Sequence, residues 1–301
     1  MFELVEFPSE GAILRGRHYA HADGAGVTLV MAHGTSATVP MAMDAYAEAF
    51  FAAGYDVLAY DHRGFGASGG EPRQEINPWT QGRGYRDAVA YLRRGGGAGR
   101  IALWGDSYSA MVVLVAGALI EEIGAIVAQI PACGASLPGE MPEGAFELLR
   151  ETFAGGDVSG GPGETTGPLP VVSFDQAGTP SLLTPIQAFR WFIEYGGRFG
   201  TLWQNRVTRV IPATPVPFTP WITAPRLVMP VLVMVGRGDE MPGCDPEVQR
   251  AVYARIPGRK SFHEIDGGHF GLLWTDGPLF EEAAAAQVGF LRTHLPPSVL
   301  T

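Results

Sequence analysis

The stretch LWGDSYSAM, residues 103–111, places one serine at the join of two apolar segments. The segment before it, RIALWG, is typical of a buried strand, and the segment after it, AMVVLVAGALI, is typical of a helix. Gly105 and Ser109 flank Ser107 at the spacing of a nucleophile elbow, a strained strand-to-helix turn. The hydroxyl of such a serine points out at the carboxyl edge of a sheet, where open α/β folds bind ligands.

Around this turn, the first third of the chain alternates between strand and helix signals. Short apolar runs such as GVTLVMAHG and YDVLAYDHRG are followed by helical patterns such as MDAYAEAFFAAG and GRGYRDAVAYLRRGG. GAILRGRHYA alternates apolar and polar residues and predicts an antiparallel edge strand. Strands alternating with helices indicate βαβ units, so we expect an α/β protein with a mostly parallel, twisted sheet and helices on both faces.

The alternation stops near residue 133 and resumes near residue 225. Between them the chain holds a Gly/Pro-rich stretch at 155–167, an aromatic-rich segment and the proline-dense IPATPVPFTPWITAP. An insertion of this length carries structure of its own. We therefore expect residues 1–132 and 225–301 to form one α/β core, and residues 133–224 to form a cap or lid over the carboxyl edge of its sheet. The stretch 155–167 is either a hinge or disordered.

Composition narrows the classes of partner. The net charge is −10 without a basic cluster, so nucleic acid is not an expected partner. Cys133 and Cys244 fit no CxxC pattern, which argues against a disulfide framework and a zinc site. The N-terminus lacks a basic region followed by an apolar core, and the apolar runs fall short of about 20 residues, so neither a signal peptide nor a membrane span is expected.

We infer from these patterns a cytoplasmic protein that acts on a small-molecule substrate. No cofactor and no metal are expected to take part, and a homodimer is compatible with the sequence.

Ser107 needs a base and an acid, because an unassisted serine hydroxyl is a poor nucleophile. In folds that carry this elbow, the acid and then the histidine follow the serine along the chain. VLVMVGRGDEM ends a strand at Asp239, and FHEIDGGHFG ends the next strand with His269 on a glycine-flanked loop. We therefore predict that His269 takes the Ser107 proton and that Asp239 orients the ring and stabilises the imidazolium.

Other acidic residues compete with Asp239. Glu240 is adjacent and is expected to point elsewhere, and Asp245 is expected to cap the helix that begins near Pro246. Asp266 lies on the same strand end as His269 and could support it. The remaining histidines are weaker candidates because they lie in mid-strand, in the terminal helix or before the elbow: His263, His294, His18, His21 and His62.

Acyl transfer also requires hydrogen-bond donors for the oxyanion. MAHGTSAT ends an early strand, and we expect the donors to be the backbone N–H groups of Thr35 and of Tyr108, the residue after the nucleophile. The side chain of His33 is expected to be structural. Aromatic residues are concentrated in the insertion, where most should form the cap's own core. Several should line an apolar acyl or aromatic pocket, and the candidates are Phe189, Trp191, Phe192, Trp203 and Trp221.

The landmarks HGTSA, YDHRGFGASGGEPR, GDSYSA, GRGDEM and DGGHFG, taken together, resemble the α/β-hydrolase family in order and spacing. The resemblance covers both flanks of the insertion. The run through GGEPR is most similar to the dienelactone-hydrolase-like and Xaa-Pro-peptidase-like branch, which includes bacterial esterases and fungal polyketide acyltransferases. It implies an α/β-hydrolase fold in which the loop at residues 61–68 is structural. Serine at position 107 argues against haloalkane dehalogenases and epoxide hydrolases, which use aspartate there.

The sequence thus predicts a serine hydrolase that cleaves a carboxylic ester of a small to medium apolar or aromatic acid through an acyl-enzyme. The same triad would also serve an acyltransferase or thioesterase of secondary metabolism, or a hydrolase of C–C or amide bonds. A non-catalytic binding module is disfavoured, because such modules often lose a triad member and here all three are present. The sequence names neither the substrate nor the acyl acceptor.

Overall fold

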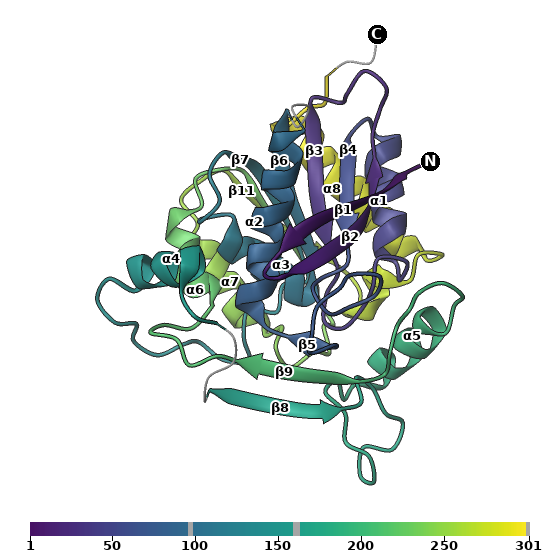
Figure 1. Ribbon diagram of the computed structural model, residues 1–301, viewed down its shortest axis with the longest axis vertical. Coiled ribbons are helices and arrows are strands. Elements are labelled where there is room, and N and C mark those ends of the chain that lie inside the picture. Colours follow the sequence, from purple (N-terminus) through teal and green to yellow (C-terminus); the bar gives the residue numbers. More distant parts are fainter. Residues whose placement is uncertain (96–98, 159–162, 299–301) are drawn as a thin grey trace.

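The computed structural model describes residues 1–95, 99–158 and 163–298, and its core is an eight-stranded sheet (Figure 1). The strand order is β1-β2-β4-β3-β6-β7-β10-β11, antiparallel across the first two pairs and parallel from β4 onward. The predicted mostly parallel sheet is confirmed. The strands are β1 (Glu3–Ser9), β2 (Ala12–Tyr19), β3 (Val27–Ala32), β4 (Asp56–Tyr60), β6 (Arg100–Asp106), β7 (Ile123–Gln129), β10 (Val231–Gly236) and β11 (Lys260–Ile265).

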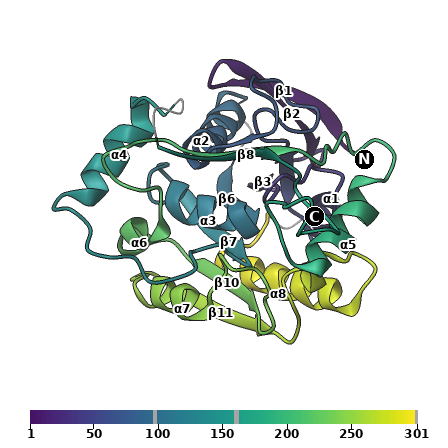
Figure 2. The same cartoon turned by 90° about the horizontal axis from the view of Figure 1, so that it is seen from below.

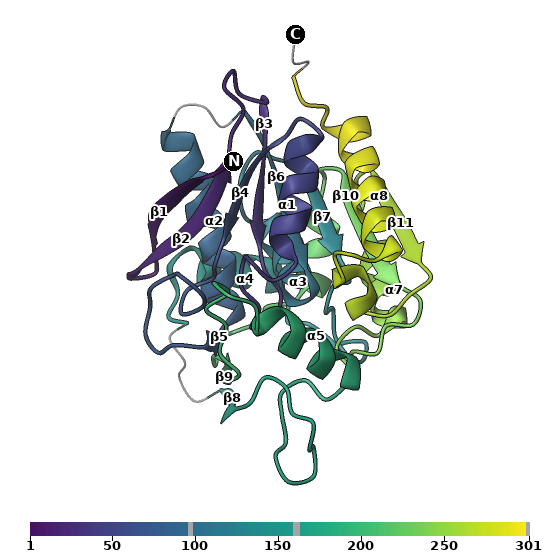
Figure 3. The same cartoon turned by 90° about the vertical axis from the view of Figure 1, so that its right-hand side faces the viewer.

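Helices cover both faces of this sheet because its central strands are apolar on both sides. In β3 every residue is buried, and alternate side chains enter two separate cores. Helices α1 (Met43–Ala52) and α8 (Pro278–His294) pack on one face, as Figure 3 shows. The other face is covered by α2 (Pro78–Arg94), α3 (Ser107–Ala116) and α7 (Pro246–Ala254). No helix among the described residues is long and apolar enough to cross a membrane.

One prediction about the sheet edge is wrong. Strand β2 is antiparallel, as its alternating pattern indicates, but it is not at the edge, because β1 pairs along its outer side. The two strands are joined by a tight turn at Glu10 and Gly11, both with positive φ (46° and 73°). Strand β1 is therefore the edge strand, and β2 is shielded.

The insertion contributes helices and two strands, β8 and β9. Together with β5, which precedes the insertion, they form a second, three-stranded sheet of order β5-β9-β8. This sheet crosses below the carboxyl ends of the main strands (Figures 1 and 2). Part of the stretch expected to be a hinge or disordered is strand, β8, which pairs with β9; residues 159–162 lie outside the described residues. The elements are α4 (Ala145–Gly155), β8 (Glu164–Leu169), α5 (Ile186–Gly196), β9 (Val207–Ile211) and α6 (Pro220–Thr223), with β5 (Glu75–Ile76) from the preceding segment.

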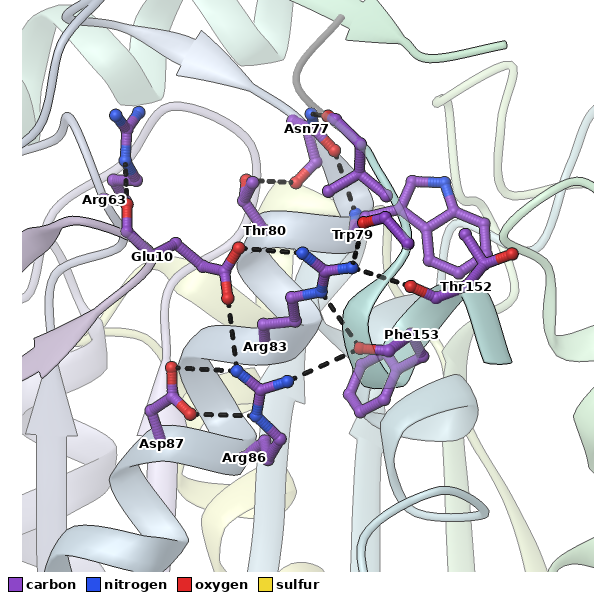
Figure 4. Close-up of polar contacts among 12 residues, drawn as sticks. Glu10, Arg63, Asn77, Trp79, Thr80, Arg83, Arg86, Asp87, Thr152 and Phe153 are labelled. Carbon is purple, nitrogen blue, oxygen red and sulfur yellow. Dashed lines mark hydrogen bonds and ion pairs between the residues drawn. The ribbon is translucent and has the colours of Figure 1, made fainter. Parts of the chain in front are cut away.

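A buried arginine ties the first helix of the insertion to the core (Figure 4). The guanidinium of Arg83, on α2, donates to the backbone carbonyls of Thr152, Phe153 and Gly156 at 2.6, 3.0 and 2.7 Å. These carbonyls lie at the end of α4, where the helix dipole is negative, and that of Thr152 also accepts from the backbone N–H of Gly156 at 2.9 Å. Glu10 pairs with the same guanidinium at 2.8 Å, so the charge of Arg83 is balanced.

Candidate active site

The turn between β6 and α3 has the conformation expected of a nucleophile elbow. Strand β6 ends at Asp106, and α3 begins at Ser107, whose φ is 53°. A non-glycine residue in this region is strained, and such strain is concentrated at functional sites. A steric clash explains why residue 105 is glycine, because a Cβ there would lie 2.4 Å from the carbonyl of Ser109. The backbone therefore needs glycine before the serine.

His269 connects the serine to an acid. Its Nε2 lies 2.9 Å from Oγ of Ser107, and its Nδ1 lies 2.8 Å from Oδ2 of Asp239. The tautomer with the proton on Nδ1 satisfies both contacts, because Nδ1–H then donates to the carboxylate and Nε2 accepts from the serine hydroxyl. The side chains of His269 and Asp239 are only 2% and 4% exposed, so this pair works in a low-dielectric environment. The structure thus brings together the three residues predicted as a triad.

In the described part of the chain, none of the competing acidic residues is observed in contact with a ring nitrogen of His269. Asp245 caps α7, accepting from the backbone N–H groups of Glu247 and Val248 as predicted. Asp266 is exposed. Glu240 corrects our expectation that it points elsewhere: its Oε2 accepts from the backbone N–H of His269 at 2.8 Å. It holds the histidine loop from the main-chain side.

Two further groups lie close to His269. Asp106, behind the elbow, is buried, and burial raises its pKa to about 6 while attraction to His269 opposes that rise. The Sγ of Cys244 lies 3.6 Å from Nδ1 of His269, and burial raises the pKa of this thiol well above its usual range. Asp239, Cys244 and His269 could together ligate a metal. Since Asp239 and Ser107 already engage both ring nitrogens, the observed arrangement orients the ring for proton transfer.

The predicted oxyanion donors border the nucleophile. Thr35 and Ser107 line the same cavity, and Tyr108 is the second residue of α3, so its N–H is one of the first four without an acceptor inside the helix. The turn that carries Thr35 approaches the elbow closely. A Cβ on Gly34 would lie 3.0 Å from the carbonyl oxygen of Asp106 and 3.1 Å from Cβ of Ser107.

Ser109, which departs from the usual glycine, has a structural role that the sequence did not show. Its buried hydroxyl donates to the carbonyl oxygen of His33 at 2.5 Å and contacts Nε2 of His62 at 2.8 Å. Nε2 of His33 in turn accepts from the backbone N–H of His62 at 3.2 Å. These bonds fasten the end of β3 and the loop after β4 to the elbow helix.

The predicted pocket aromatics divide into two groups. Trp191 and Phe192, on α5, line a confined space of about 20 Å³ together with Ser107 and His269. That space suffices for about one water molecule. A neighbouring cavity of about 390 Å³ shares four lining residues with it, which are Thr35, Ser107, Leu183 and Met241.

The expectation for the other three aromatics is corrected. Trp221 lines a different cavity, where the guanidinium of Arg255 lies 4.1 Å from its ring centre. Trp203 packs on Phe192, with ring centres 5.6 Å apart, and Phe189 packs on Phe174 at 5.8 Å. Phe189 and Trp203 pack against other aromatic rings of the insertion. None of the three residues lines either cavity that borders Ser107.

A parallel sheet with a serine elbow at its carboxyl edge, followed in the chain by an acid and a histidine, defines the α/β hydrolases. The chain belongs to the alpha/beta hydrolase family, whose match spans residues 29–285. It is 30% identical to thiohydrolase aneE of Aspergillus aculeatus, over 98% of this chain and 94% of that protein. It is 31% identical to polyketide transferase af380 of Aspergillus fumigatus, over 97% of this chain and 98% of that protein.

Solved structures agree on the fold. The alpha/beta hydrolase GrgF from Penicillium sp. sh18 superposes with a TM-score of 0.72 at 23% identity, covering 98% of this chain and 99% of that one. The family match and the two sequence relatives show that the protein is an enzyme of the alpha/beta hydrolase family, in which these relatives are named a hydrolase and a transferase.

Proposed function

We propose that the protein is a serine hydrolase that cleaves a carboxylic ester of a small to medium apolar or aromatic acid. The observation that carries this proposal is the hydrogen-bonded chain from Ser107 through His269 to Asp239 at a strained turn. A serine that merely began a helix would need neither the positive φ nor a buried histidine aimed at its hydroxyl. A nucleophile needs both, because the base must reach Oγ while Oγ faces the substrate.

In this mechanism Oγ of Ser107 attacks the ester carbonyl carbon as Nε2 of His269 takes the hydroxyl proton. The tetrahedral oxyanion accepts from the backbone N–H groups of Thr35 and Tyr108. The C–O bond to the alcohol then breaks, and His269 returns the proton to the leaving alkoxide. A water molecule attacks the acyl-enzyme with the same histidine as base, which releases the acid and regenerates the serine. The Asp239 carboxylate stabilises the imidazolium in both halves of the reaction.

The lining near the nucleophile supports an apolar acyl group. The space beside Ser107 and His269 holds only about one water molecule, but the adjoining cavity of about 390 Å³ has room for an acyl group and is lined by Leu182, Leu183 and Met241 among others. Burying apolar atoms there contributes about 25 cal/mol for each Å² removed from water. The confined space admits little solvent, which strengthens the electrostatic contacts of the triad.

A thioesterase or an acyltransferase is the second candidate, and the names of the relatives favour it. Two that align over nearly the whole chain are named a thiohydrolase and a polyketide transferase. The same residues would form the same acyl-enzyme from a thioester. A transferase would pass the acyl group to an alcohol or amine in place of water.

Intact-mass spectrometry after reaction with a fluorophosphonate tests the proposed nucleophile. We expect one adduct on the wild type, none on Ser107→Ala, and one on Ser136→Ala, which removes an exposed serine. Ser107→Ala should also lower turnover by several orders of magnitude. Matched esters and thioesters, with and without an alcohol acceptor, then separate the two candidates. Absence of an adduct on the folded wild type would refute the proposal and favour a binding module.

A further inference from the structure

The cavity of about 390 Å³ beside the nucleophile contains one charged group. Its lining includes Ser107, Thr35 and Tyr108, and otherwise consists mainly of small and apolar residues. Among the described residues that line it, Arg209 alone carries a charge. Arg209 is exposed to solvent, so the cavity has a positive charge at its rim and mainly apolar walls further in.

Arg209 is held in place by the small sheet of the insertion. It lies on β9, where it pairs with Ile76 of β5 on one side and Thr166 of β8 on the other. Burial raises the pKa of the Tyr108 phenol to about 12, and the positive charge of the neighbouring Arg209 opposes that rise. Ser107, Tyr108 and Arg209 line the same cavity, so one bound molecule can reach both the nucleophile and the guanidinium.

The charge of Arg209 is not balanced by the protein. Among the described residues, eight of the twenty arginines form ion pairs with carboxylates, as in Arg83–Glu10, Arg198–Glu194 and Arg250–Glu264, and Arg209 belongs to the rest. Within residues 1–95, 99–158 and 163–298, no carboxylate forms an ion pair with Arg209. A guanidinium carries five N–H donors in a planar fork that matches carboxylate and phosphate, which is more than one phenol oxygen can accept from.

Arg209 also lines a second cavity, next to the first. This cavity, of about 470 Å³, is also lined by Tyr108, and among its described lining residues Arg209 is again the only charged one. Its other walls include Trp79, Met111 and Phe218. Arg209 is exposed, so its guanidinium lies at the solvent side of both cavities. Arg209 thus borders two adjoining cavities with apolar walls, one of which reaches the nucleophile.

We propose that Arg209 binds an anionic group of the acyl substrate, a carboxylate or a phosphate, while the acyl carbonyl lies at Ser107. This inference rests on the proposed function, because it places the reacting carbonyl at the same serine. The anion has two sources: a carboxylate at the far end of the acyl chain, or a phosphate on a pantetheine-type leaving group. Both would make bidentate, charge-assisted bonds to the guanidinium.

Two pairs of substrates test this binding and separate the sources. The first pair compares adipoyl with hexanoyl thioesters of N-acetylcysteamine, which differ in a terminal carboxylate. The second compares hexanoyl thioesters of phosphopantetheine and pantetheine, which differ in a phosphate. The measurement is the ratio of kcat/KM for the anionic member to that for the neutral member, in wild type, Arg209→Met, Arg209→Lys and Arg206→Met.

We expect one of the two ratios to fall about 10- to 100-fold in Arg209→Met, since a hydrogen bond to a charged group contributes in that range. Arg209→Lys should retain part of the ratio. Arg206→Met should retain all of it, because Arg206 precedes β9 and lines neither cavity. The pair that responds identifies the source of the anion. If both ratios in Arg209→Met equal those of the wild type, the inference is wrong.

Failure of the proposed function would look different. In that case the wild type would form no fluorophosphonate adduct and would cleave none of the four substrates. Calorimetric titration of Ser107→Ala with the monomethyl ester of adipate and with phosphopantetheine then tests Arg209 without turnover. Binding that weakens about 10-fold or more when Arg209→Met is added supports the anion site. Equal affinity with and without that change, or no binding of either compound, overturns it.

Discussion

Acid should remove a stabilising contribution of His33, which fastens the end of β3 to the elbow. The ring is 1% exposed. Its Nδ1–H donates to the carbonyl oxygen of Gly34 at 2.9 Å, and its Nε2 accepts from the backbone N–H of His62. Nε2 can accept only while the ring is neutral. Burial accordingly lowers the pKa of His33 from 6.5 to about 4.

The sign and size of the effect follow from this pKa. Between pH 6.5 and about 4 the unfolded chain binds a proton at His33 that the folded protein does not, so the contribution of this group to the free energy of unfolding falls as the pH falls. From pH 7 to pH 5, linkage gives a loss of about 2 kcal/mol from this group. Burial raises the pKa values of Asp61 and Asp106 to about 6, so from pH 7 to pH 5 each carboxylate opposes His33 by about 1.3 kcal/mol. Burial lowers the pKa of His62, which therefore acts in the same direction as His33.

Urea unfolding of wild type and His33→Gln at pH 7 and pH 5 compares the protein with and without this ring. Asp106 is present in both proteins, and NMR titration of Asp61, whose Oδ1 lies 3.8 Å from Nε2 of His33, shows whether its pKa is also the same in both. The variant keeps an uncharged acceptor for the N–H of His62. We expect the change in the free energy of unfolding from pH 7 to pH 5 to be about 2 kcal/mol more favourable in the variant than in the wild type. Equal changes in the two proteins would refute the argument. So would a wild-type His33 ring that titrates near pH 6.5 by NMR, a measurement that does not depend on the variant's fold.

Three further changes probe the site and its support. Asp239→Asn should lower kcat about 10³- to 10⁴-fold, because it disturbs the tautomer of the histidine, whereas Asp266→Asn should change kcat only a few-fold; a larger loss in the second would reassign the acid. Gly34→Ala should lower kcat about 10- to 100-fold with little change in the fold, since its Cβ would displace a predicted oxyanion donor. Arg83→Met should lower the free energy of unfolding by about 3 kcal/mol in urea titrations, against about 0.5 kcal/mol or less for exposed Arg150→Met. Equal effects of the two arginine changes would show that the α4 carbonyls do not need Arg83.

The sequence by itself determined the sheet, the elbow and the order of serine, acid and histidine. These features depend on local patterns: buried strands read as continuous apolar runs, a strained turn needs small neighbours, and strand ends of a parallel sheet meet at one edge. That edge brings Ser107, Asp239 and His269 together across gaps of many residues, so a local reading was sufficient for them.

Only the tertiary structure decided what surrounds the triad. Glu240 faces the His269 loop, Ser109 joins β3 to α3, and Trp221 packs under Arg255 away from the nucleophile. Arg209 reaches the cavity because β9 pairs with β5 and β8 across long separations in the chain. None of these contacts follows from the spacing of residues, since the path of the insertion depends on non-local pairing and packing. The path of the insertion therefore decides that Trp191 lines the space beside Ser107 whereas Trp221 lines a different cavity.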